Sequence, residues 1–234
     1  YMTKQINLDN LNYYEIEPEN NSFFDVVADI THRCNMECKN CYVPNRFIPD
    51  MEIKPYEEFI AKLPNPIMIR IVGAEPTLHP QLIDFINIGF KHGHNCILIT
   101  NGLRMSSESF VNKIEATGLK HVYMSLNGIE NDDWYEQIDE MRCATKKIKA
   151  FKNCKDKFNM NAGIILVKGI NEQAPAAALE LITREKVPDI TLRFKNVGQL
   201  GRYQKEADEN LKMADMVKLC AAQLGHTEDY IWSH

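Results

Sequence analysis

Residues 26–41 read Val26-Val-Ala-Asp-Ile-Thr-His-Arg-Cys34-Asn-Met-Glu-Cys38-Lys-Asn-Cys41 and join a short β-type run to three cysteines. The small and β-branched residues of 26–30 predict a strand, and the polar residues after them predict a loop. The cysteines follow a C-x3-C-x2-C spacing. Three thiolates on one short loop suit a four-iron cluster, and they leave one iron without a protein ligand. We therefore expect metal chemistry at the end of the first strand.

A structural zinc site is the alternative interpretation of this loop. Clustered zinc cysteines usually come as C-x2-C pairs, with a second Cys or His pair downstream. The chain has no second C-x2-C, and its histidines form no matching pair. A zinc site here would need a distant fourth ligand. The spacing alone leaves both interpretations open and favours the cluster.

Downstream of the cysteines, apolar runs of strand character alternate with segments of helical periodicity. Six strands are expected, over residues 26–30, 67–72, 96–100, 121–125, 161–167 and 189–194. Helices are expected to follow them near residues 55, 80, 106, 131 (running to 151), 172 and 207 (running to 224). This alternation predicts an α/β fold with a parallel sheet and crossover helices. Six units form either an open doubly wound sheet or an incomplete barrel. In both folds ligands gather at the carboxyl ends of the strands.

Length and composition indicate an ordinary globular protein. The chain has 234 residues, of which 44% are hydrophobic and 25% charged, which excludes a disordered or fibrous protein. We expect one domain over residues 25–225, a lead-in segment over 1–24 and a tail over 226–234. The formal charge of −5 argues against nucleic acid as a partner. No apolar run approaches the roughly 18 residues that span a bilayer, and the N-terminus lacks a signal-peptide core, so we expect a cytoplasmic protein with no membrane partner.

The loops after the expected strands carry the unusual residues. Gly73-Ala-Glu-Pro76 follows the second strand, Thr100-Asn-Gly102 the third, and Ser125-Leu-Asn-Gly128 the fourth. Each loop alone can be only a turn, because Gly and Asn-Gly are common where strands end. All of them project from one edge of the sheet, beside the cysteines. A shared site at that edge is the stronger interpretation.

In these features the chain resembles the radical S-adenosylmethionine (SAM) superfamily, over roughly residues 25–200. The cysteine spacing combined with Gly73-Ala-Glu-Pro76 is the specific part of the resemblance. The resemblance implies an incomplete (β/α)6 TIM-like barrel of parallel strands with outer helices. It also implies one [4Fe-4S] cluster, with SAM bound to the fourth iron. SAM would be cleaved to methionine and a 5′-deoxyadenosyl radical, which takes a hydrogen atom from the substrate.

The same resemblance gives roles to individual residues. Cys34, Cys38 and Cys41 are the implied cluster ligands. The other implied contacts are with SAM and involve Tyr42, Gly73, Ala74, Glu75, Pro76, Thr100, Asn101, Ser125, Asn127, Val167 and Arg193. Among them, Gly73–Glu75 would receive the SAM amino group, and Ser125 and Asn127 the ribose or the methionine carboxylate. The stretch ending at Val167 would lie under the adenine, and Arg193 or Lys168 would pair with the carboxylate. No further catalytic side chain is assigned.

Two positions depart from the family pattern. Ala74 stands where glycine is usual, a mild change if the backbone conformation allows a Cβ atom. Asn40 precedes the third cysteine, where an aromatic residue is usual, and Tyr42 follows instead. This second departure leaves the adenine contacts of the loop open.

Of the remaining cysteines, Cys96 and Cys220 are expected in the core, and Cys143 and Cys154 in the core or as surface thiols. A second cluster would need more thiolates near the C-terminus, where only Cys220 lies. We therefore expect a single cluster.

Two alternatives to a hydrogen-abstracting radical SAM enzyme remain. One is a non-catalytic iron–sulfur or zinc protein that transfers electrons or binds a partner, and the other is a SAM enzyme that cleaves a different C–S bond. The Gly73-Ala-Glu-Pro76 loop argues against the first, because a mere cluster holder needs no receptor for the SAM amino group. The substrate is expected to be a small molecule or a short peptide. A flavodoxin- or ferredoxin-type protein is the expected one-electron reductant.

Overall fold

Six β-strands form a single parallel sheet in which the spatial order equals the chain order. The structure is a computed structural model that describes residues 24–43, 47–64, 66–197 and 210–233. The strands are β1 (Asp25–Asp29), β2 (Met68–Val72), β3 (Asn95–Thr100), β4 (His121–Ser125), β5 (Asn159–Leu166) and β6 (Ile190–Asn196). Parallel neighbours in chain order need a crossover connection between each pair, and helices lie in all of these connections. The expected parallel α/β fold is confirmed.

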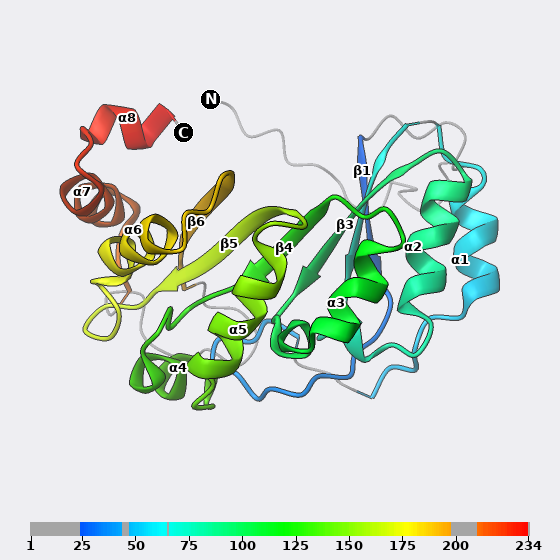
Figure 1. Ribbon diagram of the computed structural model, residues 1–234, viewed down its shortest axis with the longest axis horizontal. Helices are drawn as coiled ribbons and strands as arrows, with labels where there is room; N and C mark the ends of the chain where they lie inside the picture. The colour runs from blue at the N-terminus through cyan, green and yellow to red at the C-terminus, as the bar shows by residue number, and fades with distance from the viewer. Residues whose placement is uncertain (1–23, 44–46, 65, 198–209, 234) are drawn as a thin grey trace, which may run out of the picture.

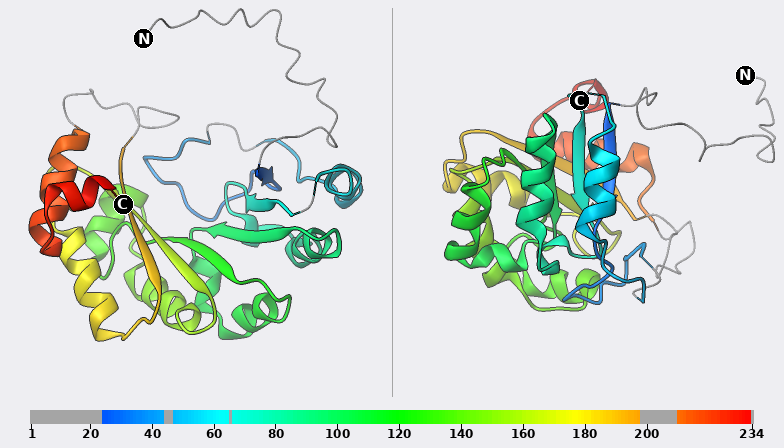
Figure 2. Two further views of the ribbon diagram at one scale, coloured as in Figure 1. Left: turned by 90° about the horizontal axis from the view of Figure 1, so that it is seen from above. Right: turned by 90° about the vertical axis from the view of Figure 1, so that its right-hand side faces the viewer.

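The helices lie outside the sheet, which curves into an open arc (Figures 1 and 2). They are α1 (Ile53–Ile60), α2 (Leu82–Lys91), α3 (Glu108–Glu115), α4 (Asp132–Asp139), α5 (Ala144–Cys154), α6 (Ala174–Arg184), α7 (Met213–Leu224) and α8 (Glu228–Ser233), with 3-10 turns η3 (Pro76–Leu78) and η4 (Leu103–Ser106). β1 and β6 do not pair with each other, so the barrel is incomplete, as expected.

Alternate side chains of each strand face opposite sides of the sheet. Those of one set, such as Ile69, Leu98 and Val122, are fully buried against the helices and form the main core. Those of the other set, such as Ile97 and Tyr123, line a cavity on the concave side. The concave side is therefore the side that is open to ligands.

The single helix expected over residues 131–151 is wrong, because two helices occupy this stretch. Asn131 caps α4, and its Oδ1 atom accepts from the backbone amides of Asp133 and Trp134 at 2.8 and 3.1 Å. Glu140 ends α4 with a φ of 54°, a left-handed conformation that an α-helix cannot contain. The Asp132 carboxylate then accepts the Ala144 amide at 2.8 Å, at the start of α5.

The C-terminal part of the chain also differs from the expectation. The last long helix, α7, begins at Met213 rather than near residue 207, and residues 207–209 lie outside the described parts. Gly225 ends it with a φ of 71°. Residues 228–233, expected as a tail, form α8. The expected lead-in segment lies outside the described residues except for Phe24. No helix within the described ranges combines the length and apolarity needed to span a bilayer.

Candidate functional site

The three cysteines of the loop after β1 are not joined by disulfides within the described residues, and each is half-buried. Met36, between the first two, is only 2% exposed and packs in a small core with Leu103 and Tyr135. Cys34 and Cys38 pack against the edge of the same core. A buried methionine thus anchors this loop to η4 and α4, because its exposure would cost hydrophobic free energy.

The base of the cysteine loop pairs with the loop after β2. The backbone amide of Ala74 donates to the carbonyl oxygen of Thr31 at 2.8 Å, and that of Glu75 donates to Arg33 at 2.9 Å. A Cβ atom at Gly73 would lie 2.4 Å from the Thr31 carbonyl oxygen, so this close approach requires glycine. Ala74 is not among the described non-glycine residues with left-handed backbones, which explains why alanine is accepted there.

Glu75 is fully buried, and its carboxylate is held by protein donors. Oε1 accepts from the Thr77 hydroxyl at 2.5 Å, the Thr77 amide at 3.1 Å and the Thr100 hydroxyl at 2.6 Å. Oε2 accepts from the Asn101 amide at 2.6 Å. A buried carboxylate needs such compensation. Glu75 therefore ties the loop after β2 to the end of β3. Pro76 follows it, buried at the start of η3.

Asn101 extends this connection to the cysteine loop. Its Nδ2 atom donates to the Asn35 side-chain oxygen at 2.8 Å and lies 3.9 Å from the Cys34 sulfur. Its Oδ1 atom accepts from the Leu103 amide at 2.9 Å. The ends of β1, β2 and β3 are thus joined by side chains from three loops.

The end of β4 contributes Ser125, which is half-buried, and Asn127, which is buried. The Asn127 amide is held on both sides: Nδ2 donates to Asp139 at 2.9 Å, and Oδ1 accepts from the Ile165 amide at 3.0 Å. Asn127 thereby fixes the end of β4 against β5 and α4.

These side chains surround one hollow of about 190 Å³, called the cysteine pocket below. The expected site residues that line it are Cys34, Cys38, Cys41, Tyr42, Gly73, Ala74, Glu75, Thr100, Asn101, Ser125 and Asn127. It adjoins a cavity of about 550 Å³ on the concave side of the sheet, called the interior cavity below. Both are lined by Asn40, Tyr42, Ile99, Ser125, Asn127 and Ile165. A ligand at the cysteines can therefore extend into the barrel.

Three expected site residues lie outside the cysteine pocket. Pro76 supports it from the buried start of η3. Val167 lines a separate hollow of about 220 Å³ with Ile138 and Val197. Arg193 lines the interior cavity. The β5 residue that lines the cysteine pocket is Ile165, whereas Val167, just after the strand, does not line it.

Sequence reasoning missed Lys147 and Asp139, which also line the cysteine pocket. Lys147 is fully buried, and its ammonium donates to the carbonyl oxygens of Asn101 and, at 3.1 Å, Ser125. Its position was a detectable signal, because Lys147 stands four residues from both Cys143 and Phe151, on the buried face of α5. A lysine is almost never fully buried unless its charge is paired, so a lysine on an apolar helix face indicates a partner inside the protein.

Nearby charges and burial shift the pKa values of Cys38 and Asp139, which line the cysteine pocket. Burial raises the pKa of the Cys38 thiol far above its ordinary value, the Asp139 carboxylate raises it further, and the Lys147 ammonium lowers it. Burial also raises the pKa of Asp139, against the opposing effects of Lys147 and the Asn127 amide. Thiols must lose their protons to bind iron. Lys147 is thus the group that favours the thiolate form.

The donor set fits a cluster with several metal ions. Within the described residues, no group of three His, Cys, Asp or Glu side chains could hold one metal ion. The three thiols instead lie around the wall of one pocket. A four-iron cluster binds each cysteine at a different iron, so it accepts ligands placed in this way and keeps one iron open.

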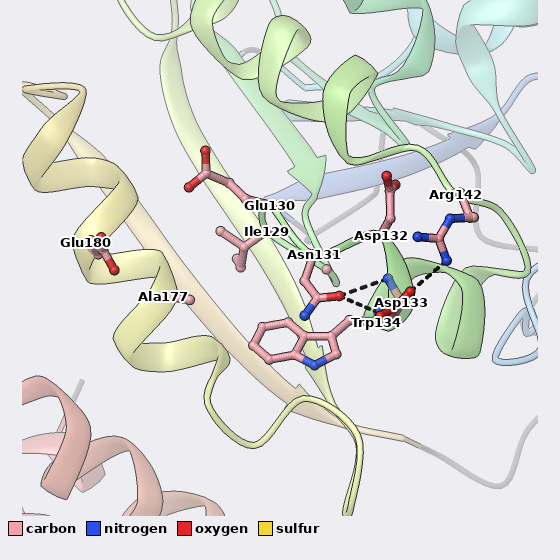
Figure 3. A pocket seen from close by; sticks show the side chains of 10 residues that line it. Ile129, Glu130, Asn131, Asp132, Asp133, Trp134, Arg142, Ala177 and Glu180 are labelled. Carbon is pink, nitrogen blue, oxygen red and sulfur yellow. Dashed lines mark hydrogen bonds and ion pairs between the residues drawn. The ribbon is translucent and has the colours of Figure 1, made fainter.

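A separate hollow of about 520 Å³ lies on the outer surface around the start of α4 (Figure 3). It shares no lining residue with the cysteine pocket. Several charges in and beside it are paired: Arg142 lies 2.6 Å from Asp133, and Arg184, next to the hollow, lies 2.7 Å from Glu130. These groups stabilise the turn and the cap of α4, and the hollow is no part of the site.

Curated relatives match most of this chain at low identity. A 7,8-dihydro-6-hydroxymethylpterin dimethyltransferase of Methanocaldococcus jannaschii is 25% identical over 211 residues, which are 83% of this chain and 41% of the relative. An Fe-coproporphyrin III synthase of Methanosarcina barkeri is 26% identical over 198 residues, 81% of this chain and 48% of the relative. The chain thus spans less than half the length of either relative.

The fold has known counterparts as well. Streptococcus suis SuiB bound to its precursor peptide SuiA matches 90% of this chain and 46% of SuiB, with a TM-score of 0.68 and 16% identity. The family model of the Radical SAM superfamily, whose members are enzymes that use a [4Fe-4S] cluster and SAM, matches residues 29–182. That match covers all three cysteines and the loops after β2, β3 and β4. The chain belongs to the radical SAM superfamily.

Proposed function

We propose that this chain is the cofactor-binding barrel of a radical SAM enzyme that abstracts hydrogen from a small-molecule or short-peptide substrate. The observation that carries the proposal is the convergence of three cysteines and three strand-end loops on one pocket. When bound there, the reduced cluster and SAM supply a 5′-deoxyadenosyl radical and methionine. The domain that does this extends over residues 25–225.

The protein's own residues hold and orient these groups. Cys34, Cys38 and Cys41 bind the cluster, and Met36 keeps their loop in place. The backbone of Gly73–Glu75, held by the buried Glu75 carboxylate, receives the SAM amino group. The remaining proposed SAM contacts come from Tyr42, Asn101, Ser125 and Asn127, with Pro76 and Thr100 supporting the loop after β2. Ile165 of β5 forms the apolar wall of the cysteine pocket, and Val167 follows it in the hollow that shares Asn40 with that pocket.

The interior cavity is the proposed place of the substrate. Its walls include Ile97, Ile99 and Ile165, which place an apolar surface next to the cysteine pocket. The relatives carry names of enzymes that act on a pterin and a porphyrin, and SuiB binds a peptide, so the family admits both substrate kinds. We propose a flavodoxin- or ferredoxin-type reductant and a cytoplasmic setting, where low-potential electrons are available.

The test is anaerobic reconstitution with iron and sulfide, reduction with dithionite and addition of SAM. Mass spectrometry should find 5′-deoxyadenosine. Cys38→Ala should abolish the product and lower the iron content, whereas Cys220→Ala, a buried cysteine of α7, should keep both. Bound zinc in place of iron would overturn the proposal. Cleavage to 5′-methylthioadenosine instead would indicate a SAM enzyme that breaks a different C–S bond.

A further inference from the structure

The interior cavity is lined by three cationic side chains, Arg70, Arg193 and Lys195, and by no aspartate or glutamate among the residues described. The charge of Arg70 is paired, because its guanidinium lies 2.6 Å from the carboxylate of Asp25, the first residue of β1. The chain as a whole carries a formal charge of −5. The described lining of this cavity is therefore positively charged, although the protein as a whole is negatively charged.

Arg193 and Lys195 have no carboxylate partner within the described residues. They stand two residues apart on β6, so both point to the same face of the sheet. The Arg193 guanidinium carbon lies 5.9 Å from the centre of the Tyr123 ring, and the Lys195 ammonium lies 5.1 Å from it. A ring face attracts cations but neutralises no charge.

Tyr123 reaches these cations across a neighbouring strand. It belongs to β4, and β5 lies between β4 and β6. Gly163 is the β5 residue paired with Arg193, and a Cβ atom there would lie 2.2 Å from the Tyr123 hydroxyl oxygen. Glycine at this position is therefore what lets the phenol ring extend to β6. Three strands thus contribute to one arrangement of two cations around one aromatic ring.

The charges of Arg193 and Lys195 favour the binding of an anion. Two cations near one ring repel each other, although solvent screens part of this repulsion because both side chains are exposed. An anion between them would remove that repulsion and accept hydrogen bonds from both. A guanidinium and an ammonium suit a carboxylate or a phosphate group.

We propose that the interior cavity recognises an anionic small-molecule substrate, with Arg193 and Lys195 binding its carboxylate or phosphate group and Tyr123 positioning them. This inference rests on the proposed function, because it is the neighbouring cysteine pocket that makes the cavity a substrate site. It assigns Arg193 to the binding of the substrate rather than to the binding of SAM. The anion would hold the substrate with its reacting carbon toward the cysteine pocket.

The test uses the full chain with its reconstituted cluster and two probes, inorganic pyrophosphate and succinate, at constant ionic strength. Isothermal titration calorimetry should show saturable binding of at least one probe, and the stronger probe tells phosphate from carboxylate. The double variant R193Q/K195Q should weaken that binding at least about tenfold. The matched double variant K146Q/K149Q removes two charges from exposed positions of α5, and it should bind as the wild type does.

Three results would overturn the inference: no binding of either probe, equal weakening in both double variants, or an equal loss of SAM affinity in R193Q/K195Q. The last would assign the two cations to SAM. SAM cleavage by the wild type is measured on the same preparation. Cleavage without probe binding refutes the anion site alone. Probe binding that depends on Arg193 and Lys195, without SAM cleavage, refutes the proposed function and leaves the anion site standing.

Discussion

The Nζ atom of Lys147 lies 3.1 Å from the carbonyl oxygen of Ser125, so a side chain of α5 reaches the end of β4. The same atom donates to the carbonyl oxygen of Asn101, just after β3. Lys147 is fully buried, and its charge acts on Asp139 and Cys38. One ammonium therefore joins two strand ends and balances the charge beside the cysteine loop.

Replacing Lys147 with methionine should destabilise the protein strongly. The change removes the ammonium that donates to the partly buried carbonyl groups of Asn101 and Ser125, and a buried group left unsatisfied costs about 1–3 kcal/mol. It also removes the cation whose charge acts on Asp139. Urea unfolding of the metal-free protein measures this. Lys149→Met, on the exposed side of the same helix, should stay within about 0.5 kcal/mol of the wild type. Equal urea midpoints for the two variants would show that Lys147 contributes no more to stability than an exposed lysine does.

Glu75→Gln tests the connection between the ends of β2 and β3. The amide would turn a pair of donors toward the Thr77, Thr100 and Asn101 groups that now donate to the carboxylate. We expect a loss of at least about 2 kcal/mol in the free energy of unfolding, since charged hydrogen bonds contribute about 1.5–3 kcal/mol each. SAM affinity should fall as well. Glu58→Gln, on the exposed face of α1, is the matched control. Unchanged stability would mean that the carboxylate does not hold the loop.

The sequence predicted the parallel fold because periodicity reports which face of an element is buried. It could not predict the break at Glu140, since the apolar positions of α4 and α5 keep one helical rhythm while a left-handed residue separates them. The spacing of the cysteines and the loops after the predicted strands were enough to locate the cysteine pocket. It could not locate Lys147, whose partners are main-chain carbonyl groups on other elements. Nor could it separate Arg193 from the cysteine pocket, because the direction of a side chain depends on the register of β6.

Gly73 and Ala74 make a matched pair for testing the loop after β2. Gly73→Ala would place a methyl group 2.4 Å from the Thr31 carbonyl oxygen, which is far below the contact distance of the two atoms. The backbone must shift, at a cost of about 1–3 kcal/mol. Ala74→Gly should cost less than about 1 kcal/mol, the entropy of an added glycine. Thermal unfolding of the metal-free variants compares them. A larger loss of stability in Ala74→Gly than in Gly73→Ala would contradict the close backbone approach of this loop to Thr31.

Asp50 makes the cysteine loop sensitive to acid. Burial raises the pKa of its carboxyl group, but the hydrogen bonds from Thr31 and Arg33 outweigh burial and hold the pKa below its usual value. A lowered folded-state pKa stabilises the protein above the unfolded value of about 3.9, and this contribution is lost as the pH falls through the folded-state pKa. Arg33 is half-exposed, so the contribution is about 1 kcal/mol or less.

Asp50→Asn should therefore lower the melting temperature of the metal-free protein at pH 6, and the difference from the wild type should shrink toward zero as the pH approaches about 2. Differential scanning calorimetry across this range measures it. Asp156→Asn, an exposed carboxylate after α5, controls for the general loss of a negative charge. If the wild type and Asp50→Asn differ by the same amount at every pH, the Asp50 carboxylate does not stabilise the loop through its charge. The base of the cysteine loop would then depend on the backbone pairing with Ala74 and Glu75 alone.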